Sequence, residues 1–461
     1  MNPYLLLDFG TTSTKSALVD LDTGIFARLQ RHPAIPGIPA PPGRCEIPLE
    51  AIRSRFLRIC SDYYDLMPFQ GILLCSEMHG FALLDWDGNP LTPYISWKDE
   101  RSLETLEGKD TFSLVAGQLG PAFKRITGMH PRPGFPLMNL AHLGRATPLP
   151  EGARILSLPC WLARCSGQAS ELLHPTILAG MGLYDVRRHA VSAELLELLR
   201  ELTGCCFALG EPAPAHRVAG HWQGVPIYVG VGDHQCAVLG AGNAPRQTLS
   251  INLGTGSQVT IIDWDSGQDE IETRPYFGPS QARTITHIPA GRALATHLHF
   301  LRETAGPHGP DFWALLAGLG EEEVARSTLR FDLSLFKSAR HYREGGSITR
   351  IEEGSLTLRN YLSSLLKSWM GQYLEIARLF DPDHRLSRCI LSGGLARELP
   401  LLHSLLARRS GYSTLPATEL DETLLGLRTL ALVAAGRARD YLEAQAIFGR
   451  ECRVEERFSA P

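Results

Sequence analysis

The sequence lacks the features that mark a membrane protein. Its 461 residues hold no apolar run long enough to span a bilayer, and the run at 429–435 is only a short core segment. The first apolar strand begins at Tyr4, which leaves no room for a signal peptide before it. We therefore expect a cytoplasmic protein with no membrane partner.

A strong excess of charge is also absent. The 45 basic and 49 acidic residues leave a net charge of −4 at pH 7, which gives no reason to expect a nucleic acid as partner. The ten cysteines show no paired C-x-x-C spacing, so we expect reduced, buried thiols rather than a zinc site. The length exceeds one ordinary hydrophobic core and predicts two domains.

The stretch from Tyr4 to Asp20 carries the first chemical pattern. An apolar run reaches Asp8, a turn of small residues follows, and a second apolar segment comes after it. This order predicts a strand, a tight turn and a strand. Asp8 is placed to hold a divalent cation against an anion that the turn binds. The turn can offer backbone N–H groups and four hydroxyls to that anion, those of Thr11, Thr12, Ser13 and Thr14. An ordinary hairpin is the alternative.

The same pattern returns at residues 250–263, where Gly254 and Thr255 open a second turn between two apolar strands. Two like hairpins suggest a duplicated architecture whose halves face a shared nucleotide. Neither turn is a P-loop, because no Gly-x-x-x-x-Gly-Lys-Ser/Thr follows a strand at either place.

Two polar clusters follow the first hairpin. A short buried strand at 71–75 leads into Glu77, Met78 and His79, and residues 95–101 place Trp97, Asp99 and Arg101 within five positions. His79 could hydrogen-bond a hydroxyl, and Trp97 could stack on the apolar face of a sugar. Asp99 and Arg101 could fix hydroxyls or form a structural ion pair with each other.

The strand at 226–232 runs into Asp233 and His234. An aspartate at the end of a parallel strand lies where open α/β sheets present ligands. Phosphoryl transfer to a hydroxyl needs a carboxylate that takes the proton, so we expect Asp233 to be the general base. A helix cap is the alternative. Further along, Gly393 and Gly394 at a strand-to-helix turn let a ring or a phosphate approach the backbone.

Taken together and in this order, these elements resemble the FGGY family of carbohydrate kinases. The resemblance covers nearly the whole chain through six motifs, at residues 8–15, 78–80, 97–101, 232–235, 253–256 and 392–394. It implies an α/β fold of two actin-like (ribonuclease H-like) ATPase domains with an interdomain cleft. The implied domains are residues 1–243, residues 244–440 and a tail at 441–461.

The resemblance also implies the site. Asp233 would be the base, and Asp8 and Asp233 would lie near Mg²⁺. ATP phosphates would be held by Thr11, Thr12, Ser13, Thr14, Lys15, Gly254 and Thr255, and adenosine by Gly393 and Gly394. The sugar would face Glu77, Met78, His79, Trp97, Arg101, Asp233 and His234. The implied partners are a sugar and ATP, and a homodimer is left open.

The implied activity is ATP-dependent phosphorylation of the terminal primary hydroxyl of a ketose. Met-His-Gly at 78–80 points to ketose kinases, and residues 274–278 and 295–301 favour sedoheptulokinases. Xylulokinases or other pentulose kinases are the alternative, and a non-catalytic sugar sensor on the same fold is a rival of another class. The chain departs from the family pattern at three places: Glu77 stands where glutamine is usual, Leu395 where a small residue is usual, and Glu398 or Leu399 where a short polar residue is usual.

Overall fold

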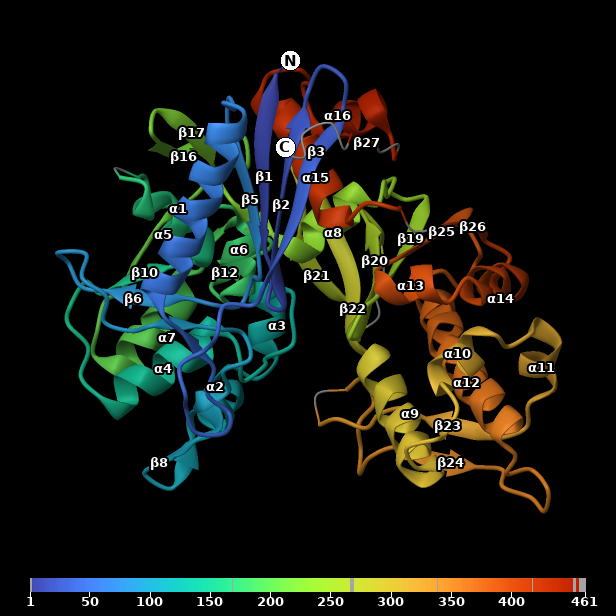
Figure 1. Ribbon diagram of the computed structural model, residues 1–461. Helices are drawn as coiled ribbons and strands as arrows, with labels where there is room; N and C mark the ends of the chain where they lie inside the picture. Colours follow the sequence, from blue (N-terminus) through green and yellow to red (C-terminus); the bar gives the residue numbers. More distant parts are fainter. Residues whose placement is uncertain are drawn as a thin grey trace. The chain divides into compact units, whose positions relative to one another are not determined.

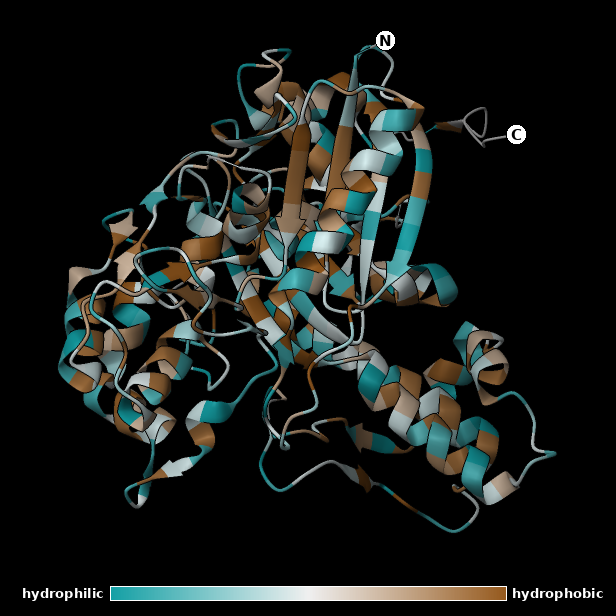
Figure 2. Cartoon of the chain, turned by 60° about the vertical axis from the view of Figure 1, so that its left-hand side comes forward, coloured by the Kyte–Doolittle hydropathy of each residue, from teal (hydrophilic) through white to brown (hydrophobic). Residues whose placement is uncertain are grey.

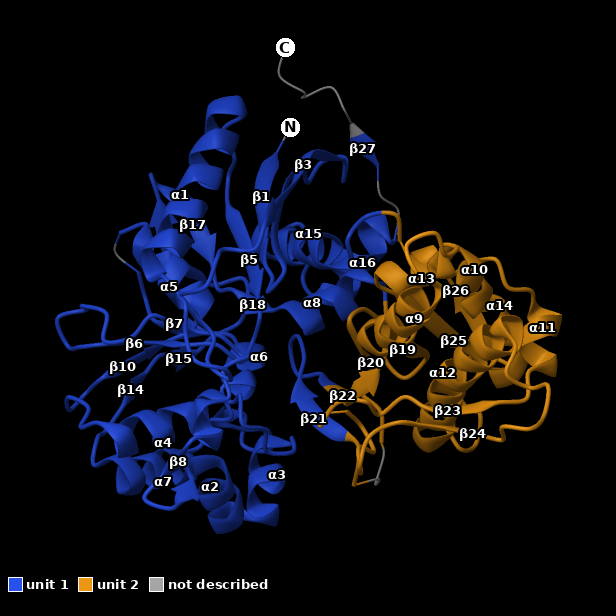
Figure 3. Ribbon diagram, turned by 60° about the horizontal axis from the view of Figure 1, so that its bottom comes forward, with its two compact units in different colours: residues 1–242, 272–281, 420–461 blue, residues 243–271, 282–419 orange. Residues whose placement is uncertain are grey.

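The computed structural model describes residues 2–167, 169–265, 269–337, 339–416, 418–450 and 453–455 (Figure 1). The chain forms two compact units (Figure 3). Unit 1 consists of Met1–Gly242, Glu272–Gln281 and Leu420–Pro461, and unit 2 of Asn243–Ile271 and Ala282–Glu419. The first change of unit falls next to the boundary predicted at 243. Two later segments, 272–281 and 420–440, pack with unit 1 although the sequence-based division assigns them to the second domain.

The main sheet of unit 1 is built around an apolar strand, β1 (Pro3–Phe9), which is buried along its whole length. β1 pairs antiparallel with β2 (Ser13–Asp20) and parallel with β5 (Ile72–Ser76). The apolar residues of the strand beside the N-terminus are brown in Figure 2. The other members of the sheet are β3 (Phe26–Pro33), β16 (Val218–Trp222), β17 (Val225–Tyr228), β18 (Val231–Gly232) and β27 (Val454–Glu455). The predicted hairpin at 4–20 is confirmed.

The helices of unit 1 bury apolar faces, and α1 (Leu49–Leu66) packs into the cluster that covers this sheet. In α1, Ile52, Phe56, Ile59 and Tyr63 are buried at helical spacing, as the sequence predicts. The helix predicted at 192–202 is α7 (Ala193–Thr203), and the Ser192 hydroxyl accepts a hydrogen bond of 3.3 Å from Leu195 N–H. The remaining helices of unit 1 are α2 (Thr111–Leu119), α3 (Pro121–Thr127), α4 (Pro136–Ala146), α5 (Leu158–Cys165), α6 (Pro175–Gly180), α8 (Asp233–Gly240), α15 (Glu422–Ala434) and α16 (Tyr441–Phe448).

Helices α8 and α15 touch through their backbones. A Cβ atom added to Gly240 would lie 1.8 Å from the carbonyl oxygen of Glu422, and one added to Gly426 would lie 2.1 Å from that of Cys236. Only glycine permits this approach at both positions. The contact matters for the site because α8 begins at Asp233 and α15 follows Asp421 directly.

Short strands complete unit 1. Three of them, β6 (Ala82–Leu84), β10 (Arg154–Leu156) and β14 (Ala208–Leu209), form a second sheet. The others are β4 (Glu46–Ile47), β7 (Tyr94–Ile95), β8 (Thr105–Leu106), β9 (Lys109–Asp110), β11 (Leu172–Leu173), β12 (Tyr184–Asp185), β13 (Ala190–Val191), β15 (Glu211–Pro212) and β21 (Glu272–Pro275).

Unit 2 repeats the opening pattern. The second predicted hairpin is β19 (Thr248–Leu253) with β20 (Gly256–Ile262), and β19 also pairs parallel with β25 (Arg388–Ser392). The strongest predicted helix is α12 (Leu358–Phe380), whose buried Trp369 donates to the Pro289 carbonyl at 3.1 Å. The other elements are β22 (Gln281–Pro289), β23 (Arg330–Asp332), β24 (Ser347–Thr349), β26 (Ser413–Leu415), α9 (Gly291–Ala305), α10 (Phe312–Ala317), α11 (Glu321–Arg326), α13 (Gly394–Glu398) and α14 (Leu401–Ser410).

None of the helices in the described parts of the chain is long and apolar enough to cross a membrane.

Candidate active site

Three strands of unit 1 end side by side and bring three carboxylates to one edge of the sheet. β5 lies between β1 and β18, with Phe9 and Gly232 both in register with Ser76. Asp8, Glu77 and Asp233 therefore stand at the same edge of the sheet, although the first and the last are 225 positions apart in the chain. Parallel α/β sheets present their ligand sites at this edge.

Asp8 is held through one of its two oxygens. Oδ2 accepts from the Lys15 ammonium at 3.0 Å and from the Thr423 hydroxyl at 2.7 Å. Oδ1 is buried and has no hydrogen-bond partner among the described residues. A buried carboxylate oxygen without a donor is costly in the protein alone and is a suitable ligand for a hard divalent cation.

Asp233 is the first residue of α8 and is partly exposed. Its Oδ1 accepts from the backbone N–H of His234 at 2.7 Å, in the first turn of the helix, which is the kind of contact that the capping alternative expects. Desolvation, followed by the nearby Asp8 carboxylate, raises the pKa of Asp233 to about 7. A carboxylate that titrates near neutral pH suits a general base.

Glu77 is the acceptor of a hydroxyl network inside the protein. Its Oε1 accepts from Tyr94 at 3.0 Å and Ser96 at 2.9 Å, and its Oε2 accepts from Thr11 at 2.8 Å. The Thr11 hydroxyl in turn accepts from the Trp97 indole N–H at 2.8 Å. Burial raises the pKa of Glu77 against the opposing effect of these hydroxyls. The network joins the first turn to the predicted sugar side.

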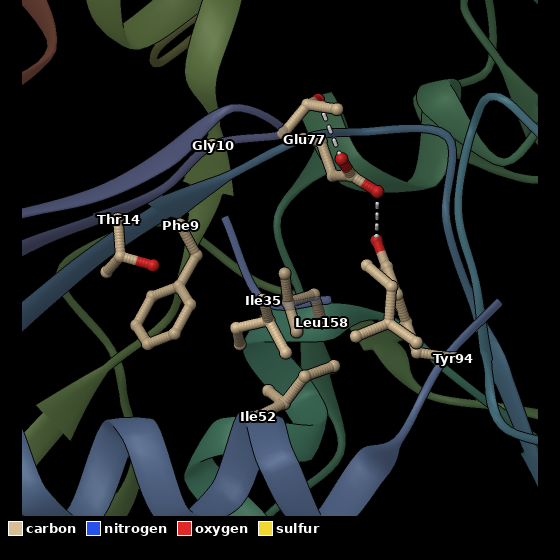
Figure 4. Close-up of a pocket in the computed structure, with 10 residues that line it drawn as sticks. Phe9, Gly10, Thr14, Ile35, Ile52, Glu77, Tyr94 and Leu158 are labelled. Atoms are coloured by element: carbon tan, nitrogen blue, oxygen red, sulfur yellow. Dashed lines mark hydrogen bonds between the residues drawn. The ribbon is translucent and has the colours of Figure 1, made fainter. Parts of the chain in front are cut away.

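A small pocket lies beneath the first turn, next to Glu77 (Figure 4). Its volume of about 30 Å³ holds a water molecule or two and not a sugar. The lining residues are Phe9, Gly10, Thr11, Thr14, Ile35, Ile47, Ile52, Glu77, Tyr94 and Leu158. The site of a sugar must therefore lie outside this pocket.

The first turn exposes fewer hydroxyls than its sequence offers. Thr12 is exposed and Thr11 is partly exposed, whereas Ser13 and Thr14 are buried at the start of β2. The Ser13 hydroxyl accepts from Arg31 at 3.1 Å. Lys15 stands opposite Asp8 in the hairpin register and contacts two carboxylates, those of Asp8 and Asp421. Roles of these residues toward phosphates stay predictions.

On the predicted sugar side, His79 is poised as a hydrogen-bond acceptor. Burial lowers its pKa to about 3, so the ring is neutral near pH 7. Its Nδ1 lies 2.5 Å from the Gly180 carbonyl oxygen, which can only accept, so Nδ1 carries the proton. Nε2 then keeps its lone pair for a hydroxyl. Trp97 is 42% exposed and leaves ring surface open to solvent.

The other predicted sugar residues are buried in protein contacts. Met78 fills the space left by two glycines, because Cβ atoms on Gly180 and Gly232 would lie within 2.7 Å of it. Arg101 is bound by Asp99 at 2.8 Å and by Glu46 at 2.6 Å, which is the structural ion pair of the alternative interpretation. The sequence did not show that Glu46 would complete this pair.

His234 lies beside a buried ionic cluster of unit 1. Glu272 on β21 pairs with Arg132 at 2.6 Å and with Arg274 at 2.8 Å. Burial, reinforced by Arg274, lowers the pKa of His234 to about 3 and keeps it neutral. The stretch 274–278, which favours sedoheptulokinases in the sequence, thus supplies one arginine of this cluster.

In unit 2 the predicted nucleotide residues come together at three turns. Gly291 N–H donates to the Gly254 carbonyl at 3.1 Å, and Arg292 N–H to the Thr255 carbonyl at 2.9 Å. Gly393 has φ +88°, and a Cβ there would lie 2.5 Å from the Leu253 carbonyl oxygen, so the position requires glycine. Leu395 Cδ1 would be 3.2 Å from a Cβ on Gly291, which places its bulk beside this group of turns.

Sequence reasoning missed Asp421 and Thr423. The only local signal is a helix-cap pattern, which the structure shows: Asp421 Oδ1 accepts from Thr423 N–H at 3.2 Å. The contact of Thr423 with Asp8 depends on packing between residues 415 positions apart, and Asp421 reaches Asp8 only through the shared Lys15 ammonium.

Residues 3–240 match the sequence profile of the N-terminal domain of the FGGY family of carbohydrate kinases. The xylulose kinase of Staphylococcus xylosus is 24% identical over 293 residues, which are 60% of this chain. The match spans 58% of the length of that relative.

Solved structures share the fold over nearly the whole chain. A xylulose kinase from Lactobacillus acidophilus covers 97% of this chain and 92% of its own, with a TM-score of 0.79 and 16% identity. A gluconate kinase from the same organism covers 96% and 92%, with a TM-score of 0.80 and 16% identity. The Plasmodium falciparum glycerol kinase with ADP covers 99% and 94%, with a TM-score of 0.79 and 15% identity. The predicted α/β fold, of the actin-like two-domain type, is confirmed. With more than half of its residues in the family profile, the chain belongs to the FGGY family of carbohydrate kinases.

Proposed function

We propose that the protein transfers the γ-phosphoryl group of ATP to the terminal primary hydroxyl of a ketose. The observation that carries this proposal is the position of Asp8 and Asp233 at strand ends on either side of β5, where the pKa of Asp233 is raised to about 7. A near-neutral base beside a cation-binding carboxylate is the arrangement that phosphoryl transfer to a hydroxyl requires.

In the proposed mechanism the free Oδ2 of Asp233 takes the proton of the attacking hydroxyl, because Oδ1 accepts from His234 N–H. Asp8 and Asp233 offer the hard oxygen ligands that Mg²⁺ prefers, and the unpartnered Oδ1 of Asp8 fits this role. When bound, Mg²⁺ neutralises charge on the phosphates. Exclusion of water around these groups favours transfer to the sugar over hydrolysis of ATP.

His79 and Trp97 are the side chains that we propose for sugar binding. His79 presents an acceptor nitrogen to a hydroxyl, and the indole ring of Trp97 is held in place by its N–H bond to Thr11. Gly254, Thr255, Gly393 and Gly394 are proposed to bind ATP from unit 2. A cytoplasmic location and a homodimer stay predictions.

Between the two expected ketoses, xylulose has the stronger support. The relatives by sequence and by fold include several xylulose kinases. Of the residues behind the sedoheptulose preference, Arg274 is engaged by Glu272, and His297 bonds to the Tyr361 hydroxyl at 2.9 Å within unit 2. Neither contact points to a particular sugar.

The test is ADP formation from ATP and Mg²⁺ with xylulose, ribulose, sedoheptulose, fructose and glycerol. We expect turnover with a ketose, and Asp233→Asn is expected to abolish it while ATP binding persists. Near-normal turnover in this variant would refute the base assignment. Silence with every sugar, together with saturable sugar binding, would instead identify the non-catalytic sensor.

A further inference from the structure

A second carboxylate lies beside Asp8. The Lys15 ammonium is 3.0 Å from Asp8 Oδ2 and 2.8 Å from Asp421 Oδ2, so two acidic groups share one cation. Thr423, two residues into the same helix start, has its hydroxyl 2.7 Å from Asp8 Oδ2 and 2.7 Å from Asp421 Oδ1. Its single proton serves one acceptor at a time. Asp421 Oδ1 has a second donor in the backbone N–H of Thr423, so the hydroxyl can serve Asp8.

All these donors act on the same oxygen of Asp8. Oδ2 receives the Lys15 ammonium and the Thr423 hydroxyl, while Oδ1 receives none in the described structure although Asp8 is only 2% exposed. Oδ1 lies 3.7 Å from the position of a Cβ on Gly10, and therefore faces the first turn. One carboxylate oxygen is thus held by two donors, and the other is buried, faces the first turn and has no donor in the described structure.

The same contacts argue against Lys15 as a phosphate ligand. Two of the three ammonium protons are directed at Asp8 and Asp421, so moving the ammonium onto a phosphate would leave these carboxylates without a counter-ion. Breaking a buried ion pair in this way is strongly unfavourable. The hairpin register, which sets Lys15 directly opposite Asp8, holds the pair together from within one local element.

We propose that Lys15, Asp421 and Thr423 are positioning residues that fix Asp8 Oδ2, so that Oδ1 alone binds the divalent cation. This inference rests on the cation site of the proposed function. Groups that hydrogen-bond to a metal ligand typically contribute about 10- to 100-fold to metal affinity. Lys15 accordingly acts on the metal through Asp8 and makes no contact with the phosphates.

The experiment measures Mn²⁺ binding to the full chain by electron paramagnetic resonance, without nucleotide. Thr423→Val removes a donor to Asp8 without changing charge, and we expect Mn²⁺ affinity to fall about tenfold. Thr429→Val is the matched control, because the Thr429 hydroxyl donates to the Leu425 carbonyl of the same helix, at 3.1 Å, and to no carboxylate of the site. Its Mn²⁺ affinity should equal that of the wild type.

Lys15→Met separates positioning from simple electrostatics. Loss of a positive charge near the cation would by itself tighten Mn²⁺ binding, whereas loss of positioning weakens it. In EDTA, ADP affinity of this variant should stay within about twofold of the wild type, since tenfold losses are expected only for a direct phosphate ligand. Tighter Mn²⁺ binding, or a tenfold loss of metal-free ADP affinity, would overturn the proposal.

Thr423→Val decides the case if Lys15→Met fails to fold, and unchanged Mn²⁺ affinity in Thr423→Val would also overturn the proposal. Absence of Mn²⁺ binding to a wild type that forms ADP would refute this inference and leave the kinase proposal standing. If the variants show the expected Mn²⁺ affinities but the protein phosphorylates no sugar, the kinase proposal is refuted and this inference stands.

Discussion

Replacing Asp233 by asparagine should stabilise the protein at neutral and alkaline pH even though it removes the proposed base. The pKa of Asp233 is raised from 3.8 to about 7, first by desolvation and then by Asp8. A raised carboxyl pKa means that the folded state disfavours the charged form. Three pKa units correspond to about 4 kcal/mol, an upper limit because the side chain is partly exposed.

The pH window follows from linkage. Below pH 4 the carboxyl is protonated in both the folded and the unfolded state, so it does not lower the free energy of unfolding. Between pH 4 and 7 the folded state holds a proton that the unfolded chain has released, so stability falls as pH rises, and the full penalty is present above pH 7. The amide of the Asp233→Asn variant cannot ionise, and the stability gap between variant and wild type should therefore widen from pH 5 to pH 8 and then level off.

The assay is thermal unfolding of both proteins in EDTA at pH 5, 6, 7 and 8. A gap in Tm on the order of 5 °C is expected at pH 8, with a smaller gap at pH 5. Asp440→Asn, at an exposed helix cap, is the control and should show no widening. Saturating Mg²⁺ should close the gap by stabilising the charged wild-type site. A gap that is constant with pH, or that narrows as pH rises, would refute the reasoning.

Three further predictions concern catalysis, the sugar side and the helix contact. In wild type, kcat/KM for the sugar should fall about tenfold for each pH unit below the pKa of Asp233, which we expect at or under pH 7, because the base must be unprotonated. A flat profile from pH 5 to 8 would contradict this. Trp97→Ala should raise the sugar KM about tenfold and leave the KM for ATP within about twofold, whereas Trp97→Phe, which keeps a ring, should raise it less; equal effects would exclude stacking. Gly426→Ala should destabilise by about 3 kcal/mol in chemical unfolding, since its Cβ would meet the Cys236 carbonyl at 2.1 Å, while Gly371→Ala has no atom within 4 Å and should not destabilise.

The parts of the fold that the sequence predicts are those whose cause is local. Alternating and continuous apolar runs set the two hairpins, and helical spacing of apolar residues sets α1, α7 and α12. Asp233 at the end of a strand is likewise visible, because a glycine and an aspartate follow a valine- and isoleucine-rich run. These features need no knowledge of distant residues.

The parts that the sequence did not predict depend on the direction in which side chains point or on packing between residues far apart in the chain. Four hydroxyls in the first turn look equivalent in the sequence, but β2 begins at Ser13 and buries Ser13 and Thr14. Glu77 looks free to grip a sugar, but three hydroxyl groups from other positions occupy its oxygens. Asp421 reads as an ordinary cap until the close packing of α15 on α8 brings it to the first hairpin.

The charge balance of unit 1 explains why these distant residues belong to one site. Asp8, Glu77, Asp233 and Asp421 contribute four carboxylates, and Lys15 is the basic residue paired with two of them. Like charges at short range raise one another's pKa values and oppose folding. Hydroxyl donors partly offset the effect of burial on the pKa of Glu77, and the ammonium pairs with Asp8 and Asp421, whereas desolvation and the Asp8 carboxylate raise the pKa of Asp233 to about 7. A divalent cation at Asp8 Oδ1 would relieve the remaining repulsion, so the property that makes the metal-free site costly also makes it bind metal and retain a base.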